Sequence, residues 1–148
     1  MSGRAPLRPH DAYRQWTPIA TRWIDNDVYG HVNNAVYYHW FDTAVNGWHL
    51  ARGLPAVAGD GPIGLVAETG CRYAAPVAYP DQVEIGLAVE RLGMSSVTYR
   101  LGVFRAGGRA ASAEGHFTHV CVDRADRRPV TLPETWRRAL GSLQGEKP

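Results

Sequence analysis

Hydrophobic residues recur at two different spacings along the chain, and the first spacing predicts a long helix. Between Asn34 and Leu50 the apolar side chains fall three or four residues apart, at Val36, Tyr37, Trp40, Phe41, Ala44, Val45 and Trp48. This spacing puts a wide, aromatic stripe on one side of an α-helix, so we expect a core element wrapped by the rest of the chain. Asn33 or Asn34 would begin the helix. Gly53 followed by Pro55 would end it.

The second spacing is an alternation of apolar and polar residues, and it predicts strands. In Gln82–Arg91 every second residue is Val, Ile or Leu, which is typical of a strand buried on one face. The segments with strand character are Thr17–Trp23, Ile63–Tyr73, Gln82–Arg91, Val97–Phe104 and Ala110–Val122. Two short segments, Leu92–Ser95 and Arg105–Gly108, would join strands as hairpins in which Gly supplies a positive φ.

The remaining segments complete an α+β pattern. Arg52–Gly64 is rich in Gly and Pro and predicts a loop, and Pro133–Leu143 predicts a short helix with three apolar residues on one face. Residues 1–16 lack periodicity, and we expect a loosely held arm. The order of one strand, one long helix and an antiparallel meander predicts a single α+β domain spanning residues 1–148.

Composition narrows the class of protein. The 148 residues are 45% hydrophobic and 20% charged, as in an ordinary globular domain. A net charge of +2 is too small to indicate nucleic acid as the main partner. Cys71 and Cys121 do not make a disulfide framework, and no apolar run resembles a signal peptide or is long enough to span a bilayer. We therefore expect a soluble, cytoplasmic protein with no nucleic-acid or membrane partner.

Candidate chemistry is concentrated directly before the long helix, in Trp23–Asn34. Two carboxylates, Asp25 and Asp27, precede the expected helix start by a few residues. Because the first turn of a helix has unpaired N–H groups and partial positive charge, it could polarise a carbonyl beside one of these acids. The alternative is that both acids only shape an Asx turn and complement the helix dipole.

The pattern Asp25-x-Asp27-x-x-Gly30-His31-x-Asn33-Asn34, followed by an aromatic helix and four strands, resembles the hotdog-fold thioesterases of the 4-hydroxybenzoyl-CoA thioesterase-like family. The resemblance extends from about Thr17 to about Pro133. It implies a curved antiparallel sheet wrapped around one central helix. It also implies hydrolysis of acyl-CoA or aryl-CoA thioesters without metal or organic cofactor, in a homodimer or homotetramer whose active sites lie at the dimer interface.

The resemblance also implies roles for individual residues. Asp27 is expected to be the catalytic carboxylate, acting either as a nucleophile or as a general base, whereas Asp25 is expected to support the turn. The substrate or its oxyanion would be bound by Gly30, His31, Asn33 and Asn34. Glu68 would contact substrate or water across the interface, unless it lies on a solvated strand face. The candidates for binding the anionic CoA tail are Arg91, Arg124, Arg127 and Arg128.

Three shorter matches to known motifs fail on context. Asp25–Gly30 begins like a calcium-binding EF-hand loop, but Val36 stands where that loop needs Glu. Gly59–Gly64 matches the dinucleotide pattern G-x-G-x-x-G, yet no strand precedes it and no helix follows. His116 and His119 would point to opposite faces of a strand, so they could not easily share a metal ion. No metal site is expected.

Two other functions remain open beside thioester hydrolysis. The same scaffold could carry a hydratase or dehydratase of acyl thioesters, because a fold alone does not choose the chemistry. It could also be a non-catalytic module that binds acyl-CoA.

Overall fold

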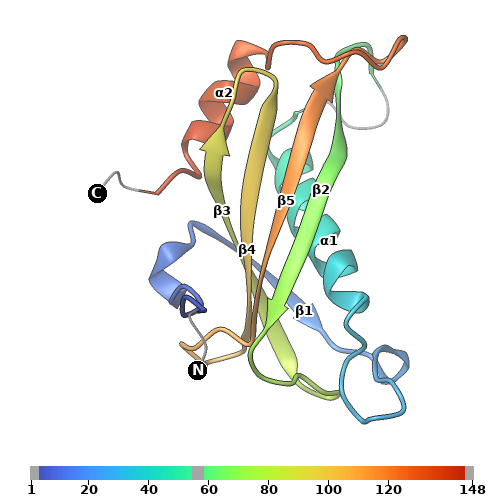
Figure 1. Ribbon diagram of the computed structural model, residues 1–148, viewed down its shortest axis with the longest axis vertical. Coiled ribbons are helices and arrows are strands. Elements are labelled where there is room, and N and C mark those ends of the chain that lie inside the picture. The colour runs from blue at the N-terminus through green and yellow to red at the C-terminus, as the bar shows by residue number, and fades with distance from the viewer. Residues whose placement is uncertain (1–3, 55–58, 146–148) are drawn as a thin grey trace.

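A five-stranded antiparallel sheet and one long helix make up most of the computed structural model, which describes residues 4–54 and 59–145. The helix is α1 (Val36–Ala51), and the strands are β1 (Gln15–Ala20), β2 (Ile63–Tyr73), β3 (Gln82–Leu92), β4 (Ser96–Arg105) and β5 (Ala113–Val122). The order across the sheet is β1-β3-β4-β5-β2, so β1 and β2 are the edges (Figure 1). A short helix, α2 (Glu134–Gly141), lies beside β3. The predicted α+β hotdog architecture is confirmed.

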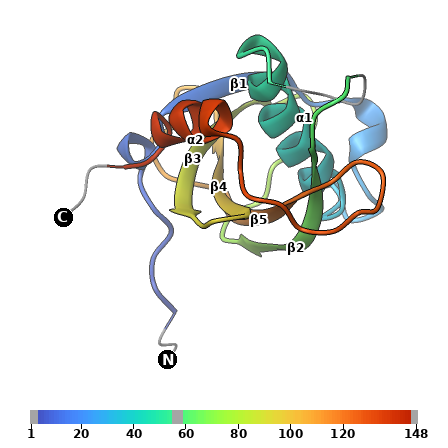
Figure 2. The ribbon, with the colours of Figure 1, turned by 90° about the horizontal axis from the view of Figure 1, so that it is seen from above.

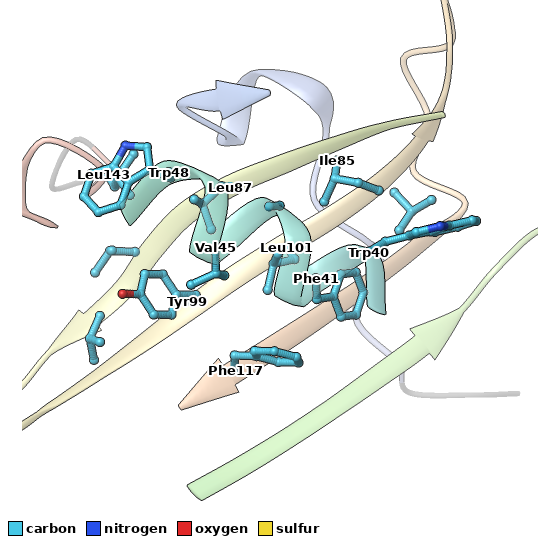
Figure 3. Packing of buried hydrophobic residues seen from close by; sticks show 14 of the residues in the cluster. Trp40, Phe41, Val45, Trp48, Ile85, Leu87, Tyr99, Leu101, Phe117 and Leu143 are labelled. Carbon is cyan, nitrogen blue, oxygen red and sulfur yellow. The ribbon is translucent and has the colours of Figure 1, made fainter. Parts of the chain in front are cut away.

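The core lies between α1 and the concave face of the sheet. Seen from above, the strands form an arc with α1 inside it (Figure 2). Figure 3 shows the aromatic stripe of α1 packed against residues of β3, β4 and β5, among them Ile85, Leu87, Tyr99, Leu101 and Phe117. Phe41 fits most closely, because a Cβ at Gly115 would overlap its ring. Removing such a buried aromatic side chain typically costs about 3–5 kcal/mol.

The first strand and the segment before it differ from the prediction. β1 ends at Ala20 rather than Trp23, and residues 23–25 form a 3-10 turn. A loosely held arm was expected over residues 1–16, but residues 10–16 pack against the sheet, and Tyr13 is only 5% exposed. Its ring lies on the convex face of the sheet, over Gly86 and Gly102, where a Cβ would collide with it. Because these two glycines on neighbouring strands have no side chains, they leave the space that the Tyr13 ring occupies.

Glycines act as expected at two of three predicted positions. Gly107 in the β4–β5 hairpin and Gly53 after α1 have φ angles of +81° and +67°, which a residue with a side chain adopts at a cost. Gly93, in contrast, is not in the positive-φ region. It provides space instead, since a Cβ there would lie 2.8 Å from Ser96 Oγ. Pro55, the second half of the predicted helix stop, lies outside the described residues. No helix in the described ranges is long and apolar enough to cross a membrane.

Two histidines, His49 (half-buried) and His119 (buried), lie near the C-terminal end of α1. His49 Nε2 is 2.7 Å from the hydroxyl oxygen of Tyr99. His119 belongs to β5, and its Nε2 has no hydrogen-bond partner among the described residues. Trp136 and Leu140 of α2 help to enclose both rings. Burial lowers the pKa of each imidazole to about 4, so both are neutral in the folded protein at pH 7.

We expect this pair to make the fold less stable in mild acid. In the unfolded chain both histidines regain a pKa of about 6.5, so the unfolded state binds protons first as the pH falls. The stabilisation is complete above about pH 6.5 and is lost towards pH 4, by about 3 kcal/mol for each histidine. Urea unfolding at pH 7.5 and pH 5.0 measures the loss. The variant His119→Phe should lose less stability over this interval than the wild type, and an equal loss would contradict the assignment.

Candidate active site

The segment between β1 and α1 folds into a tight loop that begins at Asp27. The N–H of Asp27 donates to the carbonyl of His31 at 2.8 Å, and the N–H of Gly30 donates to the carbonyl of Asp27 at 3.1 Å. Gly30 has a φ of +84°, which favours glycine at this position. An isolated bridge between Asn26 and Val32 closes the loop at its base. The motif residues 25–34 therefore form one compact turn directly before α1.

Asp25 has a structural role in this loop. Its side chain is 1% exposed, and it accepts hydrogen bonds from the backbone N–H of Arg22 at 2.8 Å and from the Arg22 guanidinium at 2.7 Å. Its backbone carbonyl accepts the N–H of Asn33 at 2.8 Å. Asp25 thus ties the end of the 3-10 turn to the start of α1, and its charge is already neutralised.

Asp27 differs from Asp25 because only part of its carboxylate is engaged. Its Oδ1 accepts the N–H of Tyr29 at 2.8 Å, which is an Asx turn. Its Oδ2 has no hydrogen-bond partner in the part of the chain that the structure describes. The turn therefore holds the carboxylate in one orientation and leaves one oxygen open. The Asx-turn interpretation of the sequence and the catalytic one are compatible in this geometry.

The helix begins at Val36 with Ala35 as its N-cap, two residues later than predicted, and Asn33 rather than Asn34 forms an Asx turn directly before it. Its Oδ1 accepts the N–H of Ala35 at 2.9 Å, and its carbonyl accepts the N–H of Val36 at 2.9 Å. Within the predicted oxyanion segment, the N–H groups of Gly30, Val32 and Asn33 are all used by carbonyls. The N–H groups of His31 and Asn34 have no acceptor among the described residues. These two amides are the donors that remain for a ligand.

The segment after β2 supports the loop from the other side. Val32 donates its N–H to Val77 at 2.7 Å, and Tyr79 donates its N–H to the side-chain oxygen of Asn26 at 3.0 Å. The Tyr73 hydroxyl donates to the carbonyl of Asn34 at 2.9 Å. Sequence reasoning missed all three contacts, because they join residues about 40 to 50 positions apart that share no motif.

Glu68 does not join this site within the chain. It pairs with His116, whose Nε2 is 3.1 Å from Glu68 Oε1, and it is 72% exposed. Its register partner in β5 is Thr118, the neighbour of the core residue Phe117. Glu68 therefore lies on the sheet face away from α1. A bulge between Val66 and Glu68 causes this, since an extra residue reverses the alternation of faces.

The four arginines predicted to bind CoA also lie away from Asp27 of the same chain. Arg91 is near the end of β3, and Arg124, Arg127 and Arg128 follow β5. Both strands end at the top of Figure 1, whereas the loop around Asp27 is at the bottom, where α1 begins. Arg124 Nε donates to the carbonyl of Gly61 at 3.1 Å, which holds this loop beside the start of β2.

Large apolar side chains are exposed around Asp27, and the edge strand β2 is exposed as well. Around Asp27, large apolar side chains point into solvent, with Val28 94% exposed; the others are Trp23, Ile24 and Tyr29. Along β2, all residues from 64 to 69 are exposed, and this strand has no partner on its outer side within the described ranges. Exposed apolar side chains and unpaired strand edges are features through which proteins commonly contact other molecules. No three His, Cys, Asp or Glu residues of the described chain are grouped so that they could hold a metal ion.

The order of elements and the loop before α1 are matched by a family model. The model of the thioesterase-like superfamily matches residues 21–140. The chain belongs to this superfamily. In this thioesterase-like protein the match begins just before Asp25 and ends within α2, so it includes the whole loop, α1 and β2 to β5. A comparison with curated proteins found no significant match.

Solved structures agree with this assignment. The PA5185 protein from Pseudomonas aeruginosa strain PAO1 is 51% identical, with 92% of this chain and 95% of that chain covered and a TM-score of 0.87. A 1,4-dihydroxy-2-naphthoyl-CoA thioesterase from Synechocystis is 17% identical over 86% of this chain and 96% of its own, with a TM-score of 0.79. The gentisyl-coenzyme A thioesterase BH1999 is 22% identical over 85% and 99%, with a TM-score of 0.75. The last two show the shared fold.

The two aspartates of the thioesterase-like motif should respond differently to the same substitution. Asp25→Asn would turn an amide N–H₂ group towards the Arg22 guanidinium and weaken charged hydrogen bonds in a buried position, which costs about 2 kcal/mol of unfolding free energy. Asp27→Asn keeps the oxygen that accepts the Tyr29 N–H, so it should cost less than about 0.5 kcal/mol. Urea unfolding of both variants tests this. Equal destabilisation by the two substitutions would contradict the division of roles.

Proposed function

We propose that this protein hydrolyses an acyl-CoA or aryl-CoA thioester to the free acid and CoA, with Asp27 as the reacting carboxylate. The supporting observation is that a carboxylate with one fixed and one open oxygen shares a short loop with two unpaired backbone N–H groups at the start of α1. Membership of the thioesterase-like superfamily and the names of the two CoA thioesterases with the same fold favour this reaction.

The chemistry needs an oxyanion site and an activated oxygen nucleophile. The N–H groups of His31 and Asn34 are donors fixed by the fold, and the partial positive charge at the start of α1 adds to their effect. In one route, Asp27 attacks the thioester carbonyl, CoA leaves as the thiolate, and water hydrolyses the resulting anhydride. In the other, Asp27 takes a proton from water, which attacks the carbonyl; the tetrahedral intermediate expels the thiolate, and Asp27 passes the proton to this leaving group. Both routes consume one water and return Asp27 to its starting state.

We also propose that two copies pair through their β2 edges. Both faces of this strand are exposed from Gly64 to Thr69, and its outer backbone groups are available for pairing. A two-fold axis makes such a pair antiparallel. The start of β2 in the partner then lies beside the end of β2 in the first copy. In this arrangement the partner's loop with Arg124, Arg127 and Arg128 is at the same end as Asp27, although the two are at opposite ends of one chain.

Asp27→Asn should lower kcat for thioester hydrolysis about 10²–10⁴-fold, as expected for loss of a nucleophile or general base. A panel of acyl-CoA and aryl-CoA esters, monitored for release of free thiol, provides the measurement. Asp42→Asn, the same substitution on the exposed side of α1, should leave kcat unchanged. Full activity of Asp27→Asn towards every ester would remove Asp27 from the mechanism. Hydration of an enoyl-CoA without thiol release, or binding without turnover, would indicate one of the other two functions.

Val66→Lys should separate the proposed dimer, because it places a charge on the exposed part of β2. Analytical ultracentrifugation should then give the mass of one chain, 16.3 kDa, in place of twice that value. Thiol release should fall together with the dimer. Gln15→Lys puts the same charge on the other edge strand, β1, and should change neither mass nor activity. A wild-type protein that sediments as a single chain would contradict the pairing.

A further inference from the structure

We propose that a recess between α2 and the concave face of the sheet is a binding site for one water molecule, held by His119 Nε2 and the Tyr99 hydroxyl. The inference does not depend on the proposed hydrolysis, because the recess lies near the C-terminal end of α1 and Asp27 lies before its start. The site explains how an imidazole is accommodated among buried apolar side chains.

The recess lies where the end of α1, the short helix α2 and the strands β4 and β5 meet. Its volume is about 10 Å³, counted as the space open to the centre of a water molecule, and this is room for about one water. Much of its wall is apolar and belongs to the core, through Val97, Leu132, Trp136 and Leu140. A larger ligand would have to displace these core side chains.

His119 supplies the polar atom that needs a partner. The residue is 7% exposed, and its Nε2 is buried with no hydrogen-bond partner among the described residues. Buried polar atoms are normally paired with a protein group or with an ordered water. The rings of Tyr99 and His119 meet nearly at right angles, with the centroids 5.2 Å apart. A water in the recess would supply the partner that Nε2 lacks.

The Tyr99 hydroxyl provides the second partner that such a water requires. Its oxygen is 2.7 Å from His49 Nε2, and Tyr99, His49 and His119 all line the recess. A tyrosine hydroxyl can both donate and accept, so one bond to His49 leaves it able to form another, whichever of the two atoms donates. An internal water typically has two to four polar partners. The water would therefore join β5 to β4 and, through His49, to α1.

Charge favours water over an ion. Of the described residues that line the recess, none is Asp, Glu, Lys or Arg. Burial lowers the pKa of both His49 and His119 to about 4, so neither imidazole is charged at pH 7. An ion buried without a counter-charge is costly. Water is neutral, and because it can donate or accept, it suits either neutral tautomer of His119.

The other ring nitrogen of His119 is in a different environment. Gly64 of β2 lies beside it, and a Cβ at Gly64 would be 3.4 Å from His119 Nδ1. Gly64 is exposed at the edge of the sheet. Because no side chain stands at this position, Nδ1 lies close to the edge of the sheet, whereas Nε2 depends on a partner inside the protein.

A crystal structure at a resolution that shows ordered waters tests the site directly. We expect one peak of electron density about 2.7–3.2 Å from both His119 Nε2 and the Tyr99 oxygen. A recess without this peak would overturn the inference, and an N–H···π contact with a neighbouring ring would then be the partner left for Nε2.

The same water can be detected in solution by nuclear Overhauser effects between water and the ring protons of Tyr99. A water held for longer than the tumbling time of the protein gives laboratory-frame and rotating-frame effects of opposite sign. His119→Phe removes Nε2 and keeps a planar ring, so it should abolish this signal. The matched control is His116→Phe, on the same strand but pairing with Glu68 at the surface, and it should retain the signal.

The outcomes separate the possible results. A signal that persists in His119→Phe would contradict the assignment of Nε2, and loss of the signal in both variants would show that it does not report on the recess. If His119→Phe does not fold, the density peak and the signal of the wild type decide the question. None of these measurements uses thiol release, so failure of the proposed hydrolysis would leave this test unchanged.

Discussion

Burial of the aromatic face of α1 against the curved sheet is the interaction on which the rest of the structure depends. Each fully buried aromatic or aliphatic side chain contributes about 1.5–3 kcal/mol, and α1 buries six side chains of these kinds or smaller. This packing fixes both the position of the helix and its rotation about its own axis. The start of α1 is therefore brought to one end of the sheet, where the loops that follow β1 and β2 can reach it.

The loop before α1 places two similar side chains, Asp25 and Asp27, in different environments. Asp25 is buried and forms an ion pair with Arg22, and this interaction stabilises the loop. Asp27 has fewer partners, and the two residues that follow it, Val28 and Tyr29, are exposed. Excluding water from a site lowers its effective dielectric constant and strengthens the electrostatic interactions that remain there. A second subunit covering these apolar side chains would produce such an environment around Asp27.

Most of the fold could be predicted from the sequence, because periodicity reports directly on which face of an element is buried. The stripe Tyr37, Trp40, Phe41 and the alternation in β3 place α1 and the central strands correctly. The position of the N-terminal segment could not be predicted. Tyr13 packs where Gly86 and Gly102 have no side chains, and no hydrophobic pattern indicates that space. Contacts between distant residues, such as Tyr73 with Asn34 or His49 with Tyr99, leave no local pattern either. The alternation of apolar and polar residues does not reveal the β2 bulge either, and this bulge determines on which face of the sheet Glu68 lies.

Gly115 of β5 affects the position of residues that are distant from it in the sequence. Phe41 approaches the backbone at Gly115 so closely that even a methyl group there would push the ring away. An α-helix is stiff along its axis, and Phe41 is only about two turns from Asn34. A shift of the Phe41 ring would therefore also move the first turn of α1. The position of the turn at Asn34 is thus set partly by the absence of a side chain at Gly115, 81 residues further along the chain.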